Sequence, residues 1–180
     1  MKGIIAILLG LTLCVADVCA QTIIKGDVST TTGKEIVESA MKYVGSPYRR
    51  GRMSPTVGFD CSGFTSFIYR MQNIVLPRSS HSQYVEEKAI NDCRDLKKGD
   101  LVFFSGSRVS KSRIGHVGIV TDVNRKTGEF SFIHSSSSQG VTVSHSTEAY
   151  YSKRYIGACR ILEEDRKLEP FLIPQFGFAE

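Results

Sequence analysis

Several hallmarks of common protein classes are missing from this sequence of 180 residues. No internal repeat is present, which excludes a solenoid or another repeat array. No pair of possible metal ligands has C-x-x-C or H-x-x-x-H spacing, which argues against a typical zinc site. No basic stripe alternates with aromatic residues, although the formal net charge is +5, which argues against a nucleic-acid-binding surface. With 41% hydrophobic residues the chain can form one domain with a core, and it is too short for two ordinary domains.

The first twenty residues have the organisation of a secretory signal. A basic start at Lys2 precedes the apolar run Ile4–Leu13, and small residues end the segment at Ala20. This run is too short to cross a membrane as a stable helix. We therefore expect export to the periplasm or the extracellular space, removal of residues 1–20, no transmembrane segment in the mature chain, and a linker over residues 21–31.

The five cysteines divide unevenly if this signal is removed. Cys14 and Cys19 fall within it, and a lipoprotein anchor at either is the weaker alternative because a bulky residue precedes each. Cys61, Cys93 and Cys159 remain, and an odd number in an exported protein favours one free thiol. A disulfide between Cys93 and Cys159 and separate burial of the two are both compatible with the sequence.

The stretch around Cys61 is typical of a helix that begins at a reactive cysteine. Asp60 is a favourable N-cap residue, and apolar residues follow it with helical spacing. These residues are Phe64, Phe67, Ile68 and Met71. The unpaired N–H groups and the positive dipole end of a helix stabilise a thiolate, which lowers the pKa of a cysteine. The alternative is a small apolar cysteine that packs at a helix start.

Two capping boxes predict further helices. Thr32 and Glu35 precede an apolar helical face that ends at the next glycine. Ser80 and Gln83 precede a short helix that is expected to run to about residue 88. His81 would lie in the first turn of this short helix, on a solvated face.

Strand patterns dominate the second half of the chain. They cover residues 101–104, 116–120, 129–134, 141–144 and 154–162, with a possible short helix at 148–151. Because helices precede strands, the expected class is α+β with a mainly antiparallel sheet. The domain should span residues 32–162, and residues 163–180 form a C-terminal tail.

Two histidines lie on neighbouring predicted strands. His116 begins one strand and His134 ends the next. If Val123 pairs with Thr127, His134 lies opposite His116. If Val123 pairs with Glu129, His134 lies opposite the residue two positions after His116. Opposed residues of an antiparallel ladder share a face, so both pairings point the two imidazoles the same way.

Together these residues supply the parts of a thiol catalyst. Cys61 would attack a carbonyl, His116 would take and return the proton, and His134 would orient His116. The alternatives are structural histidines or a zinc site built from the same three side chains. His145 follows a later strand and is assigned no role.

Seven short motifs occur in the order found in one peptidase family. They are Gly45-Ser46-Pro47-Tyr48, Phe59-Asp60-Cys61-Ser62-Gly63-Phe64, Leu76-Pro77-Arg78-Ser79, Gly99-Asp100-Leu101-Val102-Phe103-Phe104, His116-Val117-Gly118-Ile119, Phe132-Ile133-His134 and Arg154-Tyr155-Ile156-Gly157-Ala158. On these motifs the chain resembles the NlpC family of bacterial cell-wall cysteine peptidases. The resemblance implies a papain-like fold in which N-terminal helices pack on the sheet.

The resemblance also implies roles for six residues. Cys61 would be the nucleophile, His116 the base and His134 the third polar member. Three further residues would line the substrate side of the cleft: Tyr48, Asp60 and Ser62. Tyr48 could instead be an aromatic residue at the edge of the core.

The implied reaction is hydrolysis of peptidoglycan stem peptides, at the γ-D-glutamyl bond to a diamino acid, by a monomer without a cofactor or metal. The positive net charge suits a protein beside an anionic wall polymer. Arg52 and a lengthened basic loop over residues 109–113 depart from the pattern of the family, so the loops that border the cleft can differ in shape. An amidase or acyltransferase on the same scaffold and a non-catalytic wall-binding module are the alternatives.

Overall fold

A single antiparallel sheet of six strands forms the centre of the fold. In spatial order the strands are β3 (Ala89–Ile90), β8 (Tyr155–Cys159), β4 (Leu101–Ser105), β5 (Ile114–Val123), β6 (Phe130–Ser136) and β7 (Gly140–His145). The computed structural model describes residues 31–162, so the expected signal, nearly all of the linker and the C-terminal tail lie outside the described residues. The expected α+β class is confirmed, and every strand pair in this sheet is antiparallel.

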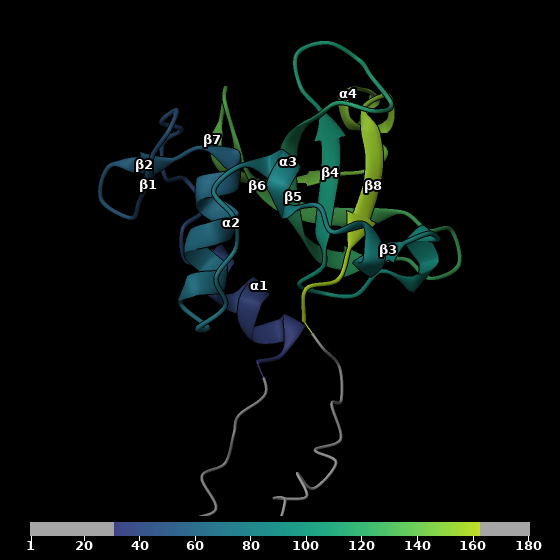
Figure 1. The fold of residues 1–180 in the computed structure, drawn as a ribbon, viewed down its shortest axis with the longest axis horizontal. Helices are drawn as coiled ribbons and strands as arrows, with labels where there is room; N and C mark the ends of the chain where they lie inside the picture. The colour runs from purple at the N-terminus through teal and green to yellow at the C-terminus, as the bar shows by residue number, and fades with distance from the viewer. Residues whose placement is uncertain (1–30, 163–180) are drawn as a thin grey trace, which may run out of the picture.

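The two longest helices cover one side of the sheet, whereas the short helix at 149–152 contributes Tyr151 to the other side. The helices are α1 (Gly33–Met41), α2 (Cys61–Arg70), α3 (Ser80–Gln83) and α4 (Ala149–Ser152), with 3-10 turns at Glu86–Lys88 and Cys93–Asp95. Figure 1 shows α1 and α2 side by side, with α2 against β5. A small hairpin of β1 (Met53–Ser54) and β2 (Gly58–Phe59) lies between α1 and α2 in the chain. No helix within residues 31–162 is long and apolar enough to cross a membrane.

Only one of the two expected capping boxes forms. Thr32 and Glu35 bond reciprocally at the start of α1, as predicted. The cap of α3 is Ser79 rather than Ser80, and α3 ends at Gln83 instead of running on to residue 88. The amide of Gln83 is buried and bonds to the side chains and backbone of α2 and its neighbours, so it cannot act as a capping group.

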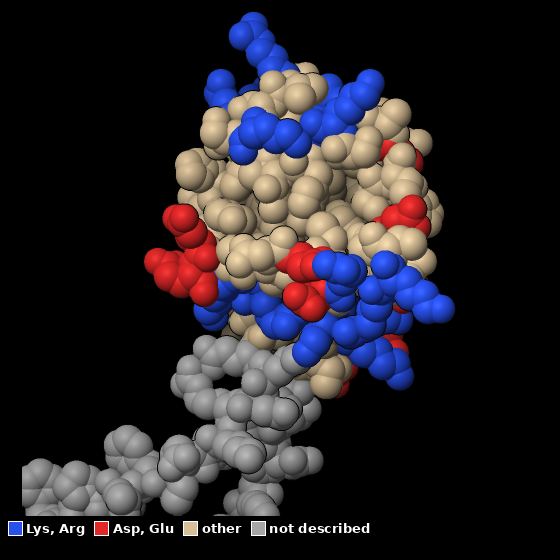
Figure 2. Space-filling view, turned by 90° about the vertical axis from the view of Figure 1, so that its right-hand side faces the viewer, with Lys and Arg blue, Asp and Glu red and all other residues tan. Residues whose placement is uncertain are grey.

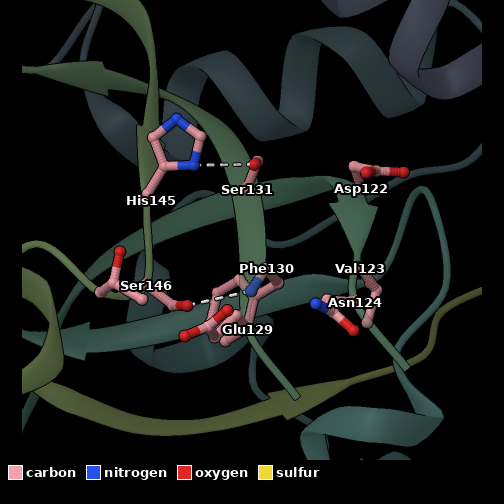
Figure 3. A pocket seen from close by; sticks show the side chains of 9 residues that line it. Asp122, Val123, Asn124, Glu129, Phe130, Ser131, His145 and Ser146 are labelled. Atoms are coloured by element: carbon pink, nitrogen blue, oxygen red, sulfur yellow. Dashed lines mark hydrogen bonds between the residues drawn. The ribbon is translucent and has the colours of Figure 1, made fainter. Parts of the chain in front are cut away.

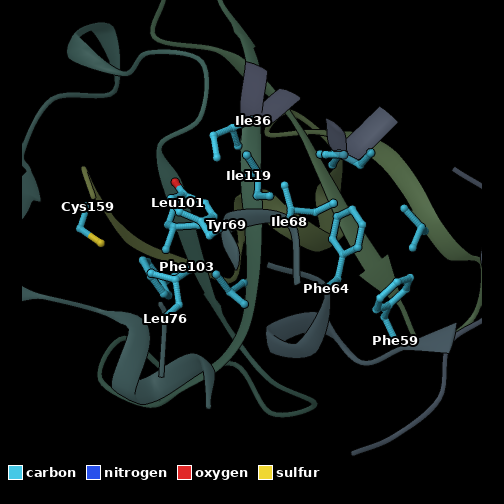
Figure 4. Packing of buried hydrophobic residues seen from close by; sticks show 14 residues of the cluster. Ile36, Phe59, Phe64, Ile68, Tyr69, Leu76, Leu101, Phe103, Ile119 and Cys159 are labelled. Atoms are coloured by element: carbon cyan, nitrogen blue, oxygen red, sulfur yellow. The ribbon is translucent and has the colours of Figure 1, made fainter. Parts of the chain in front are cut away.

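The two faces of the sheet have separate apolar clusters. One cluster joins α1 and α2 to the sheet and includes Ile36, Phe64, Ile68, Tyr69, Leu101, Phe103 and Ile119 (Figure 4). The other lies on the opposite face and includes Val102, Phe104, Val120, Phe132 and Tyr151. Burial of each large apolar side chain contributes about 1.5 to 3 kcal/mol, so the first cluster holds α2 firmly on the sheet.

The register between β5 and β6 changes at one extra residue. Near the turn, which Figure 3 shows from close by, Val123 lies opposite Phe130, so both pairings expected for Val123 are wrong. Further along, Ile119 lies opposite Ile133, and the extra residue between the two registers is Thr121. Thr121 therefore forms a β-bulge, in which two residues of one strand face one residue of the other.

This bulge decides which way the histidines point. One step beyond the pair of Ile119 and Ile133, His134 comes opposite Gly118. Gly118 shares a face with His116 because side chains alternate along a strand. Had the register at the turn continued, His134 would lie opposite Ile119 and point to the other face. The expected shared face of the two histidines is confirmed, but it depends on the bulge.

The three described cysteines are all free thiols. Cys159 is buried in the first apolar cluster. Cys93 is half-buried, and its Sγ lies 3.5 Å from the hydroxyl of Tyr155. Cys93 and Cys159 are therefore buried separately, and the alternative of a disulfide between them is not found.

Candidate active site

Cys61 is the first residue of α2, as the sequence predicts. Asp60 adopts an extended backbone conformation as the N-cap, and its Oδ1 accepts a hydrogen bond of 2.7 Å from the N–H of Gly63. The next residues turn into the helix because this cap satisfies one of the otherwise unpaired N–H groups. The Cys61 side chain is half-buried at the mouth of a cleft.

The surroundings of Cys61 raise the pKa of its thiol. Burial is the largest cause and the carboxylate of Asp60 is the second. The N–H groups of Val117, Ser62 and Cys61 itself act in the opposite direction. The expected helix-start effect therefore exists, but the expectation of a lowered pKa is wrong because desolvation and a neighbouring anion outweigh it. At neutral pH the group is a thiol, and it needs a base to react.

The two histidines form a hydrogen-bonded pair. Nε2 of His116 lies 2.9 Å from Nδ1 of His134, and the two rings are nearly perpendicular at 87°. Gly118 makes room for this pair, because a Cβ there would lie 2.6 Å from the ring of Phe132 and 3.2 Å from Cβ of His134. The structure thus brings together the two imidazoles that the sequence singled out.

The bonds of His134 define the tautomers of the pair. Nε2 of His134 lies 3.2 Å from the hydroxyl of Ser144 and 3.2 Å from that of Tyr151. If His116 accepts a proton at Nδ1, its Nε2–H has to donate to Nδ1 of His134. His134 then carries its own proton on Nε2 and donates it to Ser144 or Tyr151. No sequence pattern points to Ser144 or Tyr151, because both reach the site only through the folding of β7 and α4.

Both imidazoles are held neutral. Burial lowers the pKa of His116 to about 4, and burial together with the charge of His116 lowers that of His134 to about 3. The rings lie among aromatic side chains, with Phe104 near His116 and Phe132 near His134. A neutral His116 has a free lone pair, which is the form that a general base requires.

Cys61 and His116 reach the site from opposite layers. Cys61 comes from the helix layer, whereas both histidines lie on the face of the sheet that carries the second apolar cluster. Both residues line one cleft of about 750 Å³, so their side chains face the same space. Val117, the residue after His116, belongs to the apolar cluster against which Cys61 packs.

A smaller hollow of about 420 Å³ lies on the other side of Cys61. Tyr48, Asp60 and Ser62, the three expected substrate-side residues, all line it. Arg78 joins two of them, because its guanidinium donates two bonds of 2.8 Å to the carboxylate of Asp60 and one of 3.0 Å to Ser62. Arg78 belongs to a motif that carried the resemblance, but no role was expected for it.

Glycine at position 63 allows this network to close. A Cβ there would lie 2.2 Å from the carbonyl oxygen of Arg52 and 2.9 Å from Oδ1 of Asp60. Any larger residue would push α2 away from the loop that carries Arg52. The glycine that follows Cys61 and Ser62 is therefore required by packing.

A third pocket, of about 200 Å³, lies at the turn end of β5 and β6 (Figure 3). His145 lines it and bonds through Nδ1 to the hydroxyl of Ser131 at 3.0 Å. Neither Cys61 nor His116 lines this pocket. His145 therefore lies outside the candidate site, and His81 is exposed on α3 as expected.

Charged residues are not gathered into one basic stripe on the face seen in Figure 2. Lysines and arginines form separate groups at the top and the bottom of that face, with a hollowed, largely uncharged region between them. Within residues 31–162, no group of three or more His, Cys, Asp or Glu side chains could hold a metal ion.

Comparison with known proteins shows the family to which the chain is similar. The model of the NlpC/P60 family matches residues 45–160. The gamma-DL-glutamyl hydrolase of Bacillus subtilis is 34% identical over 72% of this chain and 30% of its own length. The murein DD-endopeptidase MepH of Escherichia coli is 33% identical over 72% of this chain and 46% of its own length. A solved NlpC/P60 family protein from Bacillus cereus superposes with a TM-score of 0.66 at 31% identity, over 76% of this chain and 42% of that one. The chain thus spans less than half the length of these two curated relatives.

Proposed function

We propose that this chain, which belongs to the NlpC/P60 family, is an exported cysteine endopeptidase that hydrolyses peptidoglycan stem peptides. One observation carries the proposal: Cys61 and His116 line the same cleft, and His134 bonds to the far nitrogen of His116. Nucleophile, base and orienting group are the three parts that acyl transfer from a peptide requires. One curated relative is named a gamma-DL-glutamyl hydrolase and the other a murein DD-endopeptidase, which supports this proposal.

The reaction begins with proton transfer. Nδ1 of His116 takes the proton of the Cys61 thiol while the sulfur attacks the carbonyl carbon of the substrate. The charge that develops on the carbonyl oxygen is stabilised by an N–H at the start of α2, and one such donor is typically worth about 3 to 4 kcal/mol of barrier. His116 then gives its proton to the leaving amine, and an acyl-enzyme with a C–S bond remains.

Water completes the cycle. Nδ1 of His116 takes a proton from a water molecule, which attacks the thioester carbon, and the C–S bond breaks. The sulfur leaves as a thiolate and recovers the proton from His116. Throughout, His134 accepts from Nε2–H of His116 and so keeps Nδ1 directed toward the sulfur.

The smaller hollow supports binding of the amino end of the peptide. The carboxylate of Asp60 and the hydroxyl of Ser62 line it, and Arg78 holds both in place. Tyr48 lines both the hollow and the larger cleft, next to Cys61. A free amine of the substrate would bond to the oxygen atoms of Asp60 and Ser62.

The bond we propose is the γ-D-glutamyl bond to a diamino acid. The name of the Bacillus subtilis relative supports this bond. The Escherichia coli relative is named as a DD-endopeptidase, which supports cleavage of a D,D bond as the second candidate. Mass analysis of the two fragments from a defined stem peptide distinguishes these bonds, and it also separates hydrolysis from transfer to another acceptor.

The test is a Cys61→Ala variant of the full chain, incubated with purified stem peptides. We expect cleavage to fall by at least about 10⁴-fold, because the nucleophile acts as one unit with its base. Cys93→Ala is the matched control, since Cys93 is another half-buried free thiol and does not line the cleft. Full activity of Cys61→Ala would refute the proposal, and binding without cleavage by the unmodified chain would support a wall-binding module.

A further inference from the structure

The larger cleft has one half that belongs to the leaving group. Cys61 lines both the cleft and the smaller hollow, whereas His116 lines the cleft alone. In the proposed reaction His116 gives its proton to the leaving amine, so the leaving residue has to lie on the His116 side. The part of the cleft that is not shared with the hollow is therefore the leaving-residue half.

The walls of this half are polar and almost uncharged. They come from residues 105–107 after β4, the turn at 136–139 between β6 and β7, and residues around α4. Among the described residues, 31–162, that line the larger cleft, Glu148 is the one carboxylate. Arg50 is the one lysine or arginine among them, but it also lines the hollow and so lies toward the Cys61 end. The two opposite charges thus occupy different parts of the cleft.

The charge of Glu148 is not neutralised by the protein. Glu148 is the exposed N-cap residue of α4, and its Oε1 accepts a hydrogen bond of 2.7 Å from the N–H of His145. No Lys, Arg or His side chain within residues 31–162 forms an ion pair with it. The remaining lone pairs of its carboxylate are available to a cation bound in the cleft.

We propose that Glu148 binds the side-chain ammonium of the diamino acid on the leaving side of the scissile bond. This inference rests on the proposed function, because it takes the leaving residue to be a diamino acid. The protein then selects stem peptides in which that amine is free. Acylation of the amine, as in a cross-link, converts the ammonium to a neutral amide that cannot form an ion pair with Glu148. Stems acylated at this position are therefore poor substrates.

The experiment compares two substrates. The full chain is incubated with L-Ala-γ-D-Glu-L-Lys and with the same tripeptide acetylated on the lysine Nε. A second pair of peptides has diaminopimelate in place of lysine, with its side-chain amine free or acetylated. We expect kcat/KM to be roughly five- to tenfold higher for the free amine, mainly through a lower KM. This ratio corresponds to the free energy of one partly exposed hydrogen bond between charged groups. Equal values for the free and the acetylated peptides would overturn the inference and leave the proposed function intact. Cleavage of none of these peptides would overturn the proposed γ-D-glutamyl specificity and the inference with it.

Variants assign the discrimination to Glu148. Glu148→Gln keeps an oxygen that can accept from the N–H of His145 but removes the charge. We expect this variant to lower the rate on the free-amine peptide to that on the acetylated one. Glu129→Gln is the matched control, because Glu129 is an exposed glutamate that also accepts one local hydrogen bond and does not line the cleft. An unchanged preference in Glu148→Gln, or an equal loss on both substrates, would overturn the assignment.

Discussion

The proposed nucleophile and the proposed base of this site are held in very different surroundings. Cys61 lies beside an ion pair and several N–H groups, all within reach of the start of α2. His116 and His134 lie among aromatic rings on the other face of the sheet. The polar side offers charge and hydrogen bonds, whereas the aromatic side removes water. Burial is nevertheless the first cause of the pKa shifts on both sides: it raises the pKa of the Cys61 thiol and lowers that of each imidazole. Both partners are therefore neutral, and a proton has to pass between them for the thiol to react.

The largest expected effect comes from filling the space that Gly118 leaves for the histidine pair on the aromatic side. A Cβ at position 118 would lie 2.6 Å from the ring of Phe132 and 3.2 Å from Cβ of His134, so Gly118→Val should displace the ring of His134. The pair with His116 would then be lost, and we expect activity to fall by at least about 10³-fold. Gly157→Ala, where an added Cβ meets only ordinary contacts of 3.5 Å or more, is the control and should retain nearly full activity. Activity of both variants on stem peptides, with circular dichroism to verify folding, is the measurement.

A smaller loss is expected when the orienting ring is removed. His134→Ala should lower kcat by roughly 10² to 10³-fold with little change in KM, because an orienting group acts mainly in the transition state. Tyr151→Phe should cost only a few-fold, since Ser144 remains to accept from Nε2 of His134. Steady-state kinetics on one stem peptide test both. An unchanged kcat in His134→Ala would remove His134 from the catalytic set.

The aromatic side should also make the fold sensitive to acid. The two rings titrate near 6.5 when unfolded, but in the folded protein the pKa is about 4 for His116 and about 3 for His134. Between these values the unfolded state binds more protons, so stability is present above pH 6.5 and is lost as the pH falls. We expect a loss of roughly 2 kcal/mol per ring between pH 7 and pH 5.

Urea unfolding at the two pH values measures this dependence. His81→Ala serves as the control, because His81 is exposed and the same loss should remain in that variant. His134→Ala should lose part of the dependence. Equal stability at pH 7 and pH 5 would show that the rings are not held neutral.

The smallest effect is expected on the polar side. Asp60→Asn keeps a good N-cap but removes the negative charge that raises the pKa of the Cys61 thiol. The pH dependence of alkylation of Cys61 by iodoacetamide should therefore shift to lower pH. Loss of the ion pair to the half-exposed Arg78 should cost no more than about 1 kcal/mol of stability. A shift to higher pH would contradict the role assigned to the Asp60 charge.

Much of the polar side could be predicted from the sequence. The N-cap at Asp60 and the start of α2 at Cys61 depend on residues within four positions of each other, and both predictions are confirmed. The strands around His116 and His134 also lie where their patterns place them. The second capping box was wrong because Gln83 serves contacts to α2, which local spacing does not reveal.

The arrangement of the aromatic side could not be predicted without the folded structure. The pairing of Val123 was wrong, and only the bulge at Thr121 restored the shared face of the histidines. Bulges depend on how two whole strands pack, and no local pattern marks them. Arg78, Tyr151 and Glu148 were also missed as site residues, because each reaches the site from a distant part of the chain.

The sequence by itself determined the α+β class, the helix that begins at Cys61, and the three side chains proposed to act together. Local hydrogen bonds and the periodicity of apolar residues are sufficient for these, because both operate over a few residues. Tertiary structure decided the pKa of the thiol, the direction of the histidine pair and the unpaired charge of Glu148 in the cleft. Burial and long-range pairing control these properties, and they exist only once the layers of the fold have come together.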